Sequence, residues 1–408
     1  MSSRAVTASR HLRLVSAEAR TSARRVAAEI STRRTLAMLI GATAFLTVGG
    51  LIMVLSASSV SAYAQYGSSF LFFKRQAAYA AVGALGLLLT SRMRYEAWQR
   101  LSAPFLVGTV ALLALVLHPS SGIEAYGASR WISVGPVTIQ PSELAKLSLV
   151  VFAATILARK WGRLSDPMHV ALPLLPVMVL VCGMVMFQPD LGTTVILAGS
   201  SFLVLFAAGV RLRYLMATGI VGTAVGVALI MGEGYRRARF LSFLHPETDP
   251  QNAGYQLFQS LIALGSGGWF GVGLGASRQK WMYVPNAHTD FIFSILGEEV
   301  GLVGEIVVLF AFGMLIYAGI RVAAGAPDVF GRLLASGIVS WFGLQIVVNL
   351  GAVTGLLPIT GVPLPMLSYG GSSLVVSLAA VGILVNVGRA PMRRAKRKVK
   401  GRTARWAA

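Results

Sequence analysis

Charged side chains are scarce in this chain, and acidic ones especially so. Asp, Glu, Lys and Arg make up 12% of the 408 residues, whereas a soluble domain carries about 25%. Only 15 residues are Asp or Glu, against 36 Lys and Arg, which gives a net charge of +21. Together with a mean hydropathy of +0.70, this composition excludes a soluble globular protein and predicts an all-α polytopic membrane protein.

Cysteine is nearly absent. Cys182 is the only one and lies within an apolar segment, so an intramolecular disulfide and a thiolate metal cluster are both excluded. Two loop motifs of other enzyme classes are missing as well, since no Gly-Lys-Ser/Thr closes a phosphate-binding loop and no Gly-x-Ser-x-Gly elbow occurs. P-loop nucleotide binding and serine acyl transfer are therefore disfavoured.

Long apolar runs are what the chain has in abundance. The core of a bilayer requires about 20 consecutive apolar residues in a helix. Ten segments approach this length: 36–58, 70–90, 102–118, 142–158, 168–187, 191–209, 213–231, 291–320, 333–356 and 366–388. We expect ten transmembrane helices forming one membrane domain over 36–390, with a large external loop, 232–290, between the seventh and eighth.

Basic residues predict the orientation of this domain. With the N-terminus inside, 27 of the 36 Lys and Arg lie on the inner side and eight on the outer side, as the positive-inside rule requires. Both termini are therefore expected in the cytoplasm. We attribute the charge to topology and to attraction for anionic lipids, and we do not expect nucleic-acid binding.

The two ends of the chain are expected to be basic cytoplasmic tails, 1–35 and 391–408. The first lacks the apolar core of a signal peptide. Its Arg/Ser/Ala-rich composition superficially resembles an organelle transit peptide, but a disordered tail is the favoured interpretation.

The external loop contains several distinct stretches. They are a basic cluster at 235–239, a turn-rich stretch at 245–250, a candidate amphipathic helix near 255–264 and the glycine-rich GSGGWFGVGLG at 265–275. A structureless loop of this length would be unusual, so function or re-entrant packing is expected. No strand precedes the glycines, and we interpret them as a place where backbones pack closely.

Ionisable residues within or beside the spans are candidates for function, because such residues are costly in a membrane. Glu143 and Lys146 lie one turn apart on the fourth span, either as an internal ion pair or as a tuned cation awaiting an anionic ligand. Asp190 follows the fifth span, either as a helix N-cap or as a functional acid. Asn349 and the Gly/Pro-rich segment 356–373 are interpreted as packing features.

His288, Thr289 and Asp290 stand at the start of the eighth span. Thr289 or Asp290 is a candidate N-cap. The surrounding loop is cationic, however, and could hold a phosphorylated lipid beside a carboxylate base. We favour Asp290 as a catalytic residue.

Five separated motifs resemble the SEDS family (shape, elongation, division and sporulation), the membrane glycosyltransferases FtsW and RodA. They are Ala128-Ser-Arg-Trp-Ile132, Gln140-Pro-Ser-Glu-Leu-Ala-Lys146, Gln188-Pro-Asp-Leu-Gly192, Ala287-His-Thr-Asp-Phe-Ile-Phe293 with Gly297-Glu-Glu299, and Leu367-Ser-Tyr-Gly-Gly-Ser-Ser373. The resemblance covers about 36–390. It implies a ten-helix fold with a large external loop between the seventh and eighth helices, in agreement with the topology above.

The resemblance also implies a reaction, polymerisation of lipid II into β-1,4 glycan strands with inversion at the donor sugar. A single displacement needs one base on the acceptor and stabilisation of the pyrophosphate leaving group. The family's essential acid falls on Asp290, the expected general base. The residues expected to bind substrate are Lys146, Glu143, Arg75, Asp190, Arg130, Trp131, His288 and Lys280. The family suggests a divalent cation, Mg or Mn, for which the sequence shows no ligand cluster.

A class B penicillin-binding protein, which is a transpeptidase, is the implied partner, along with other division proteins in the bacterial plasma membrane. The basic tails and the Ala-His-Thr-Asp motif favour the division branch, FtsW, over an elongation polymerase of the RodA type. A lipid II flippase and a noncatalytic divisome scaffold are the alternatives; no obvious inverted repeat supports a transporter.

Overall fold

We describe a computed structural model of the chain. It describes the backbone of residues 2–118, 123–125, 128–135, 137–164, 166–232, 234, 237, 240, 243, 253–281, 283 and 287–406. Side chains are described within these ranges from 29 to 393, except at 123–125, 128, 129, 134, 137, 167, 170 and 253. Most of the predicted basic cluster 235–239 and the whole turn-rich stretch 245–250 lie outside the described residues.

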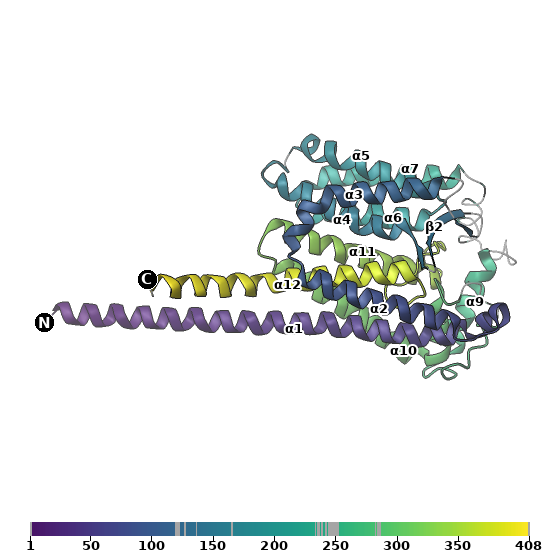
Figure 1. Cartoon of the computed structure of the whole chain (residues 1–408), viewed down its shortest axis with the longest axis horizontal. Helices are drawn as coiled ribbons and strands as arrows, with labels where there is room; N and C mark the ends of the chain where they lie inside the picture. Colours follow the sequence, from purple (N-terminus) through teal and green to yellow (C-terminus); the bar gives the residue numbers. More distant parts are fainter. Residues whose placement is uncertain are drawn as a thin grey trace.

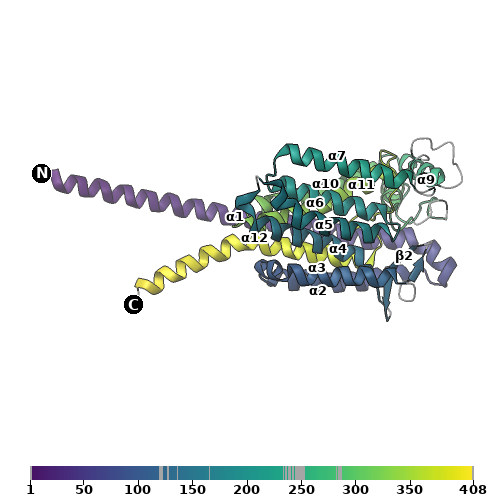
Figure 2. The same ribbon diagram turned by 90° about the horizontal axis from the view of Figure 1, so that it is seen from above.

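The molecule is a bundle of long helices lying side by side (Figures 1 and 2). They are α1 (Ser2–Tyr66), α2 (Leu71–Arg92), α3 (Tyr95–Leu117), α4 (Pro141–Arg159), α5 (Pro167–Met186), α6 (Leu191–Ala207), α7 (Leu212–Met231), α9 (Ala253–Ser266), α10 (Ile292–Ala324), α11 (Val329–Val353) and α12 (Gly371–Trp406). Both chain ends project from the same end of the bundle, while the small sheet and α9 lie at the opposite end. We call this opposite end the sheet end.

The membrane character of the helices agrees with the sequence. Among the described residues, seven helices are long and apolar enough to cross a membrane, and α6 and the Ala171–Met186 part of α5 are apolar but shorter. Each of the ten predicted spans falls largely within one helix of the bundle, the second within α2. The all-α membrane fold is thus confirmed, and the count of ten crossings stays a prediction.

Both predicted tails are helical in the structure. Helix α1 begins at Ser2, where we expected a disordered tail, and α12 continues through the basic residues to Trp406. Ala, Arg and Lys have high helix propensity. Extending an existing helix also avoids the cost of nucleation, so both tails can continue the helices from which they emerge.

A three-stranded antiparallel sheet, which the hydropathy pattern did not predict, precedes α4. It consists of β1 (Ile123–Ala125), β2 (Ala128–Val134) and β3 (Val137–Ile139) in the order β1-β2-β3. Ile132 pairs with Ile139 and Val134 with Val137, which are β-branched residues that favour strands. Gly135 has a φ of 63° in the tight turn between β2 and β3, a conformation that suits glycine.

Helices α4, α11 and α12 form the interior of the bundle. Within their membrane segments 78%, 67% and 78% of residues are buried, against 6% in α7. The polar residues of α4 and α11 therefore point into protein rather than into lipid. This arrangement brings the ionisable residues of the fourth span against α11.

The predicted amphipathic helix near 255–264 is confirmed as α9. Leu257, Ser260 and Ala263, spaced three residues apart, are buried on one face, while Phe258 and Leu261 are exposed. The Ser260 hydroxyl donates to the Val353 carbonyl at 2.8 Å. Helix α9 is thereby attached to the end of α11.

The glycine-rich stretch 265–275 packs its backbone against a break in α10, as predicted. Gly301 interrupts α10 with a φ of 73°, and Leu302 N donates to the Gly268 carbonyl at 2.9 Å. A Cβ on Gly267 would lie 1.9 Å from the Gly297 carbonyl oxygen. Only glycines permit this approach, which joins the loop to the helix that follows Asp290.

Two carboxylates of α10 hold the next part of the same loop. Glu298 accepts hydrogen bonds from the Arg278 backbone N–H at 2.9 Å and from the Ser277 hydroxyl. Glu299 accepts from the Ser56 hydroxyl of α1 at 2.6 Å and lies 3.5 Å from the Lys280 ammonium. The described part of the external loop is therefore bound to the bundle rather than extended into solvent.

Candidate functional site

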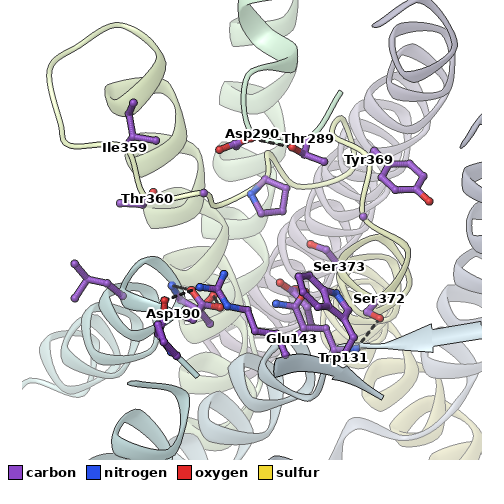
Figure 3. A pocket seen from close by; sticks show the side chains of 18 of the residues that line it. Trp131, Glu143, Asp190, Thr289, Asp290, Ile359, Thr360, Tyr369, Ser372 and Ser373 are labelled. Carbon is purple, nitrogen blue, oxygen red and sulfur yellow. Dashed lines mark hydrogen bonds between the residues drawn. The ribbon is translucent and has the colours of Figure 1, made fainter. Parts of the chain in front are cut away.

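A cavity of about 560 Å³ opens at the sheet end of the bundle (Figure 3). Its wall combines β2, β3, the turn before α6, the start of α4, the residues before α10 and the segment between α11 and α12. The lining residues are Tyr79, Arg130, Trp131, Thr138, Gln140, Glu143, Pro189, Asp190, Leu191, Thr193, Ile230, Phe240, Gln256, Thr289, Asp290, Pro358, Ile359, Thr360, Gly361, Pro363, Tyr369, Gly370, Gly371, Ser372 and Ser373.

Asp290 lies on the wall of this cavity. Helix α10 begins at Ile292 with Phe291 as its N-cap and no side-chain cap, so the alternative of Asp290 or Thr289 at the N-cap position is wrong. The Thr289 hydroxyl donates to Asp290 Oδ1 at 2.8 Å. A Cβ on Gly361 would come to 4.0 Å from Asp290 Oδ2, so Gly361 lies beside the carboxylate.

Asp190 and Glu143 add two further carboxyl groups to the cavity wall, which Figure 3 shows across the opening from Asp290. Asp190 is the N-cap of α6, where Oδ1 accepts from the Thr193 N–H at 3.0 Å and Oδ2 from the Thr193 hydroxyl at 2.9 Å. The predicted capping role is thus present, and the same carboxylate lines the cavity. Burial of a capped, hydrogen-bonded acid is a stable arrangement.

Glu143 and Lys146 form an internal ion pair, which is one of the two interpretations that the sequence allowed. The Lys146 ammonium lies 2.8 Å from Glu143 Oε2 and donates to Gln345 Oε1 of α11 at 3.0 Å. It also lies over the Trp341 ring, 5.3 Å from its centroid. Lys146 is fully buried and is not among the residues that line the cavity, so it lies behind the wall.

Arg130 and Trp131, carried by β2, do line the cavity. The Arg130 Nε donates to the Gln188 carbonyl at 2.9 Å, and its terminal nitrogen donates to the Pro189 carbonyl. The unpredicted sheet therefore fixes a guanidinium against the turn that carries Asp190. This places positive charge and an aromatic ring at the same edge of the cavity.

His288 lies behind Asp290 rather than on the cavity wall. Its ring packs between Phe72 and Tyr369, with centroid distances of 4.8 and 5.4 Å. Burial lowers the pKa of His288 to about 4, so the ring is neutral at physiological pH. Its contacts make it a packing residue.

Arg75 and Lys280 also lie off the cavity wall. Arg75 is exposed near the start of α2. Burial raises the pKa of Tyr369, and the charge and hydrogen bond of the nearby Arg75 reduce that rise. Lys280 is buried between Glu299 and the Gly275 carbonyl. These contacts hold the external loop together.

Several cavity residues were not among the predicted site residues. Tyr369 and Ser372 belong to the segment that was interpreted as packing alone, and Tyr79 lies in an apolar run. Ser372 accepts from the Gln140 N–H at 3.0 Å and donates to the Thr138 carbonyl at 3.2 Å, so it joins α12 to β3 at the wall. The polar run 368–373 was the available signal.

The described residues do not fit a metal site. They contain no group of three His, Cys, Asp or Glu side chains arranged to hold an ion. The carboxylates of Asp190 and Glu143 are already engaged by Thr193 and Lys146. We therefore derive no chemical step through a metal ion.

Comparison with known families decides what the bundle is. The sequence profile of the family described as cell cycle protein, which groups FtsW, RodA and SpoVE, matches residues 36–392. The chain belongs to the FtsW/RodA/SpoVE family. The matched region begins where α1 becomes apolar and ends in α12, and it includes every residue that lines the cavity.

Curated members of the FtsW/RodA/SpoVE family match along nearly their full length. Stage V sporulation protein E of Bacillus subtilis is 42% identical over 352 residues, which cover 86% of this chain and 96% of that protein. The probable peptidoglycan glycosyltransferase FtsW of Trichlorobacter lovleyi is 44% identical over 352 residues, covering 86% and 91%.

Solved structures of family members have the same fold. A chain of a peptidoglycan synthase complex that coordinates polymerization and crosslinking matches with a TM-score of 0.71 and 32% identity, covering 86% of this chain and 96% of that one. The rod shape determining protein RodA of Thermus thermophilus matches with a TM-score of 0.64 and 31% identity, covering 86% and 95%.

Proposed function

We propose that this protein is a peptidoglycan glycosyltransferase that polymerises lipid II, with Asp290 as the general base. The supporting observation is that Asp290 lines a cavity at the sheet end of a FtsW/RodA/SpoVE-family bundle. Relatives 44% identical to this chain are named probable peptidoglycan glycosyltransferases. The cavity wall combines carboxylates, a guanidinium and aromatic rings, which suits the sugars and pyrophosphate of a glycolipid head group.

The reaction is a single displacement that needs one base. Asp290 removes the proton from the acceptor 4-hydroxyl as that oxygen bonds to the donor anomeric carbon. The bond from this carbon to the pyrophosphate oxygen breaks at the same time, and the leaving group keeps the electron pair. Configuration inverts, and the departing pyrophosphate needs no proton, so a second catalytic acid is unnecessary.

Arg130 is the cation we assign to the departing pyrophosphate. It lies on the cavity wall, and its position is fixed by the carbonyls of Gln188 and Pro189. A guanidinium has further N–H donors in the same plane, a geometry suited to phosphate oxygens. Preorganised positive charge at a leaving group stabilises the transition state.

Trp131, Tyr79 and Tyr369 supply the aromatic surface of the same cavity. Binding sites for small molecules combine such apolar faces with a few directed polar groups. The uncharged polar groups of this cavity include Gln140, Gln256 and the hydroxyls of 372–373. We assign these side chains to the sugar rings and their hydroxyls.

The cellular role we propose is septal synthesis in the bacterial plasma membrane, with both termini in the cytoplasm. The FtsW relatives at 44% identity support the division role over the RodA role. The match to a chain of a synthase complex that couples polymerization with crosslinking supports a transpeptidase partner. We propose that this partner is a class B penicillin-binding protein.

The test is glycan-strand formation from purified lipid II by the solubilised protein together with its transpeptidase partner. We expect Asp290→Asn and Asp290→Ala to lower the rate by about 10²- to 10⁴-fold, the usual contribution of a general base. Glu96→Gln is the matched control, because Glu96 is a partly exposed carboxylate at the start of α3, paired with Arg94. Equal polymer from wild type and both Asp290 variants would remove Asp290 from the mechanism, and the absence of polymer from wild type would refute the proposed function.

A further inference from the structure

Helix α11 carries a row of polar side chains inside the bundle. Trp341, Gln345 and Asn349 follow each other at intervals of four, which places them on one face of the helix. They are 0%, 0% and 2% exposed. We call these three residues the polar row. None of them lines the cavity, so the row has no direct contact with a ligand there.

Gln345 is the centre of the polar row. Its Oε1 accepts from the Lys146 ammonium at 3.0 Å and from the Trp341 indole N–H at 2.7 Å. Both partners are donors only, which fixes the orientation of the amide. Its Nε2 therefore faces the Pro363 carbonyl, to which it donates at 2.7 Å. Gln345 thus joins the buried ion pair to a residue on the cavity wall.

Asn349 completes the connection to Asp290. Its Nδ2 donates to the Asp290 carbonyl at 2.8 Å and to the Val362 carbonyl at 2.7 Å. One amide group therefore joins two chain segments, the one that carries Asp290 and the one that carries Gly361. The bond to Val362 is buried and the bond to Asp290 is partly buried. A buried carbonyl left without its partner costs about 1–3 kcal/mol.

We propose that Gln345 and Asn349 are positioning residues for the Asp290 carboxylate, and that Lys146 acts through Gln345 rather than on the substrate. This inference rests on the proposed function. The chain of contacts runs from Glu143 and Lys146 of α4 through Gln345 to the Pro363 carbonyl, and in parallel from Asn349 to the Asp290 backbone. A general base displaced by about 1 Å loses about 100-fold in rate.

The first experiment separates kcat from KM in lipid II polymerisation. Asn349→Ser and Gln345→Leu are expected to lower kcat by about 10- to 100-fold, with KM changed less than about twofold because neither residue lines the cavity. Asn386→Ser is the matched control. Asn386 is a buried amide of α12 that accepts from Tyr95 N at 3.1 Å and donates to the Ser91 carbonyl at 2.7 Å, so it tests loss of a buried amide outside the polar row. Unchanged kcat in Asn349→Ser, or an equal loss in Asn386→Ser, would overturn the proposal.

A double-mutant cycle tests the role of Lys146. If Lys146 acts through Gln345, the Lys146→Met/Gln345→Leu enzyme is no slower than the worse single variant, and KM stays constant. If the fold-losses in kcat of the two single variants multiply in the double variant and KM rises, Lys146 instead binds the substrate. Should Lys146→Met alone fail to fold, because it leaves the Glu143 carboxylate buried without its cation, the Glu143→Gln/Lys146→Met pair replaces it in the cycle.

Hydrogen exchange gives a readout that does not depend on activity. Asn349→Ser is expected to speed exchange in a peptide covering 287–291, whereas Asn386→Ser speeds exchange near 91–95 instead. Unchanged exchange at 287–291 would refute the positioning role even in an active enzyme. Absence of polymer from wild type would refute the proposed function, while this exchange comparison would still decide whether Asn349 holds the Asp290 segment.

Discussion

His288 lies two residues before Asp290 and is held in the uncharged state by its surroundings. Phe72 and Tyr369 cover its ring, and the Tyr369 N–H donates to its backbone carbonyl at 2.9 Å. The aromatic contacts join the Asp290 segment to α2 and to the segment before α12. A neutral, packed imidazole thus stiffens the backbone beside the carboxylate without adding charge to the cavity.

This environment predicts a pH-dependent stability. The pKa of His288 falls from 6.5 in the unfolded chain to about 4 in the folded protein, so the unfolded state binds more protons between these values. Stability is then complete above pH 6.5 and declines as the pH falls towards 4. We expect His288→Phe to reduce this decline, by on the order of 1–3 kcal/mol at pH 4.

Thermal unfolding of the purified protein from pH 7 to pH 4 measures the effect. The Tm of wild type is expected to fall further than the Tm of His288→Phe across this interval, and the two proteins are compared at each pH. Parallel curves for the two proteins would show that His288 does not titrate on unfolding.

The carboxylates show why single residues were only partly predictable. Asp190 and Asp290 both stand at a polar break next to an apolar run, so both fit an N-cap position equally well. The structure gives the cap to Asp190 alone. Local sequence supplies the helix boundary to within a residue or two, but one residue of shift decides whether a side chain caps the helix or points elsewhere.

At the scale of elements, the break in α10 determines how the external loop is held. Gly301 has a φ of 73° and divides the helix, and the freed backbone groups bond with the glycine-rich stretch, as in Val303 N to the Trp269 carbonyl at 3.2 Å. The break lies eleven residues after Asp290. The loop before the carboxylate and the helix after it are consequently joined twice, through the backbone at this break and through Glu298 and Glu299.

Substitution at this break is expected to be severe. In Gly301→Ala the new Cβ would lie 2.4 Å from the Gly271 nitrogen and the residue would keep a positive φ, so we expect a loss of about 2–4 kcal/mol. The matched control is Gly313→Ala in the same helix, where nothing lies within 4 Å of the new Cβ. There alanine is expected to be neutral or to stabilise by up to about 1 kcal/mol.

Thermal unfolding of both variants in one detergent provides the comparison. Equal Tm values for Gly301→Ala and Gly313→Ala would mean that α10 can straighten at little cost. The glycine-rich stretch would then not depend on the break in α10 for its attachment to the bundle.

The small sheet is the element that hydropathy did not reveal. Its strands are three, seven and three residues long, too short for a clear alternation of polar and apolar residues between two membrane spans. The β-branched run around the turn at Gly135 was the available signal. The sheet matters for the site because β2 carries both Arg130 and Trp131 to the cavity wall.

At the scale of the whole molecule, the two ends of the bundle carry different features. The chain ends project from one end, and the cavity opens at the other. A chain that starts and finishes on the same side must cross the membrane an even number of times, which agrees with ten crossings. The peripheral helix α7, with 6% of its span buried, then faces lipid.

Cysteine accessibility tests this orientation, and the single Cys182 makes it simple, because Cys182→Ser gives a background without cysteine. In intact cells a membrane-impermeant maleimide is expected to label Ala276→Cys, an exposed position of the external loop. It is expected to label Ser2→Cys and Ala408→Cys only after permeabilisation. Labelling of either terminus in intact cells would contradict the predicted topology.

The sequence by itself determined the class of the molecule, the course of its helices and the polar residues that deserved attention. Hydropathy and basic-residue bias are summed over about 20 neighbouring residues, so they can be read from the sequence without any knowledge of packing. Five of the nine predicted site residues, Asp290, Glu143, Asp190, Arg130 and Trp131, line the cavity. All five come from motifs that also carry the family resemblance.

Only the tertiary structure decided which polar group meets which. Lys146 and Gln345 lie 199 residues apart in the chain and Ser56 and Glu299 lie 243 apart, and no local pattern encodes such pairs. A charged side chain in a membrane span must have a partner or face a cavity. The sequence alone does not show which of the two applies to a given residue. Packing of α4 against α11 placed the Lys146 ammonium against Gln345 behind the wall, while the segments before α10 and α12 brought Asp290 to its surface.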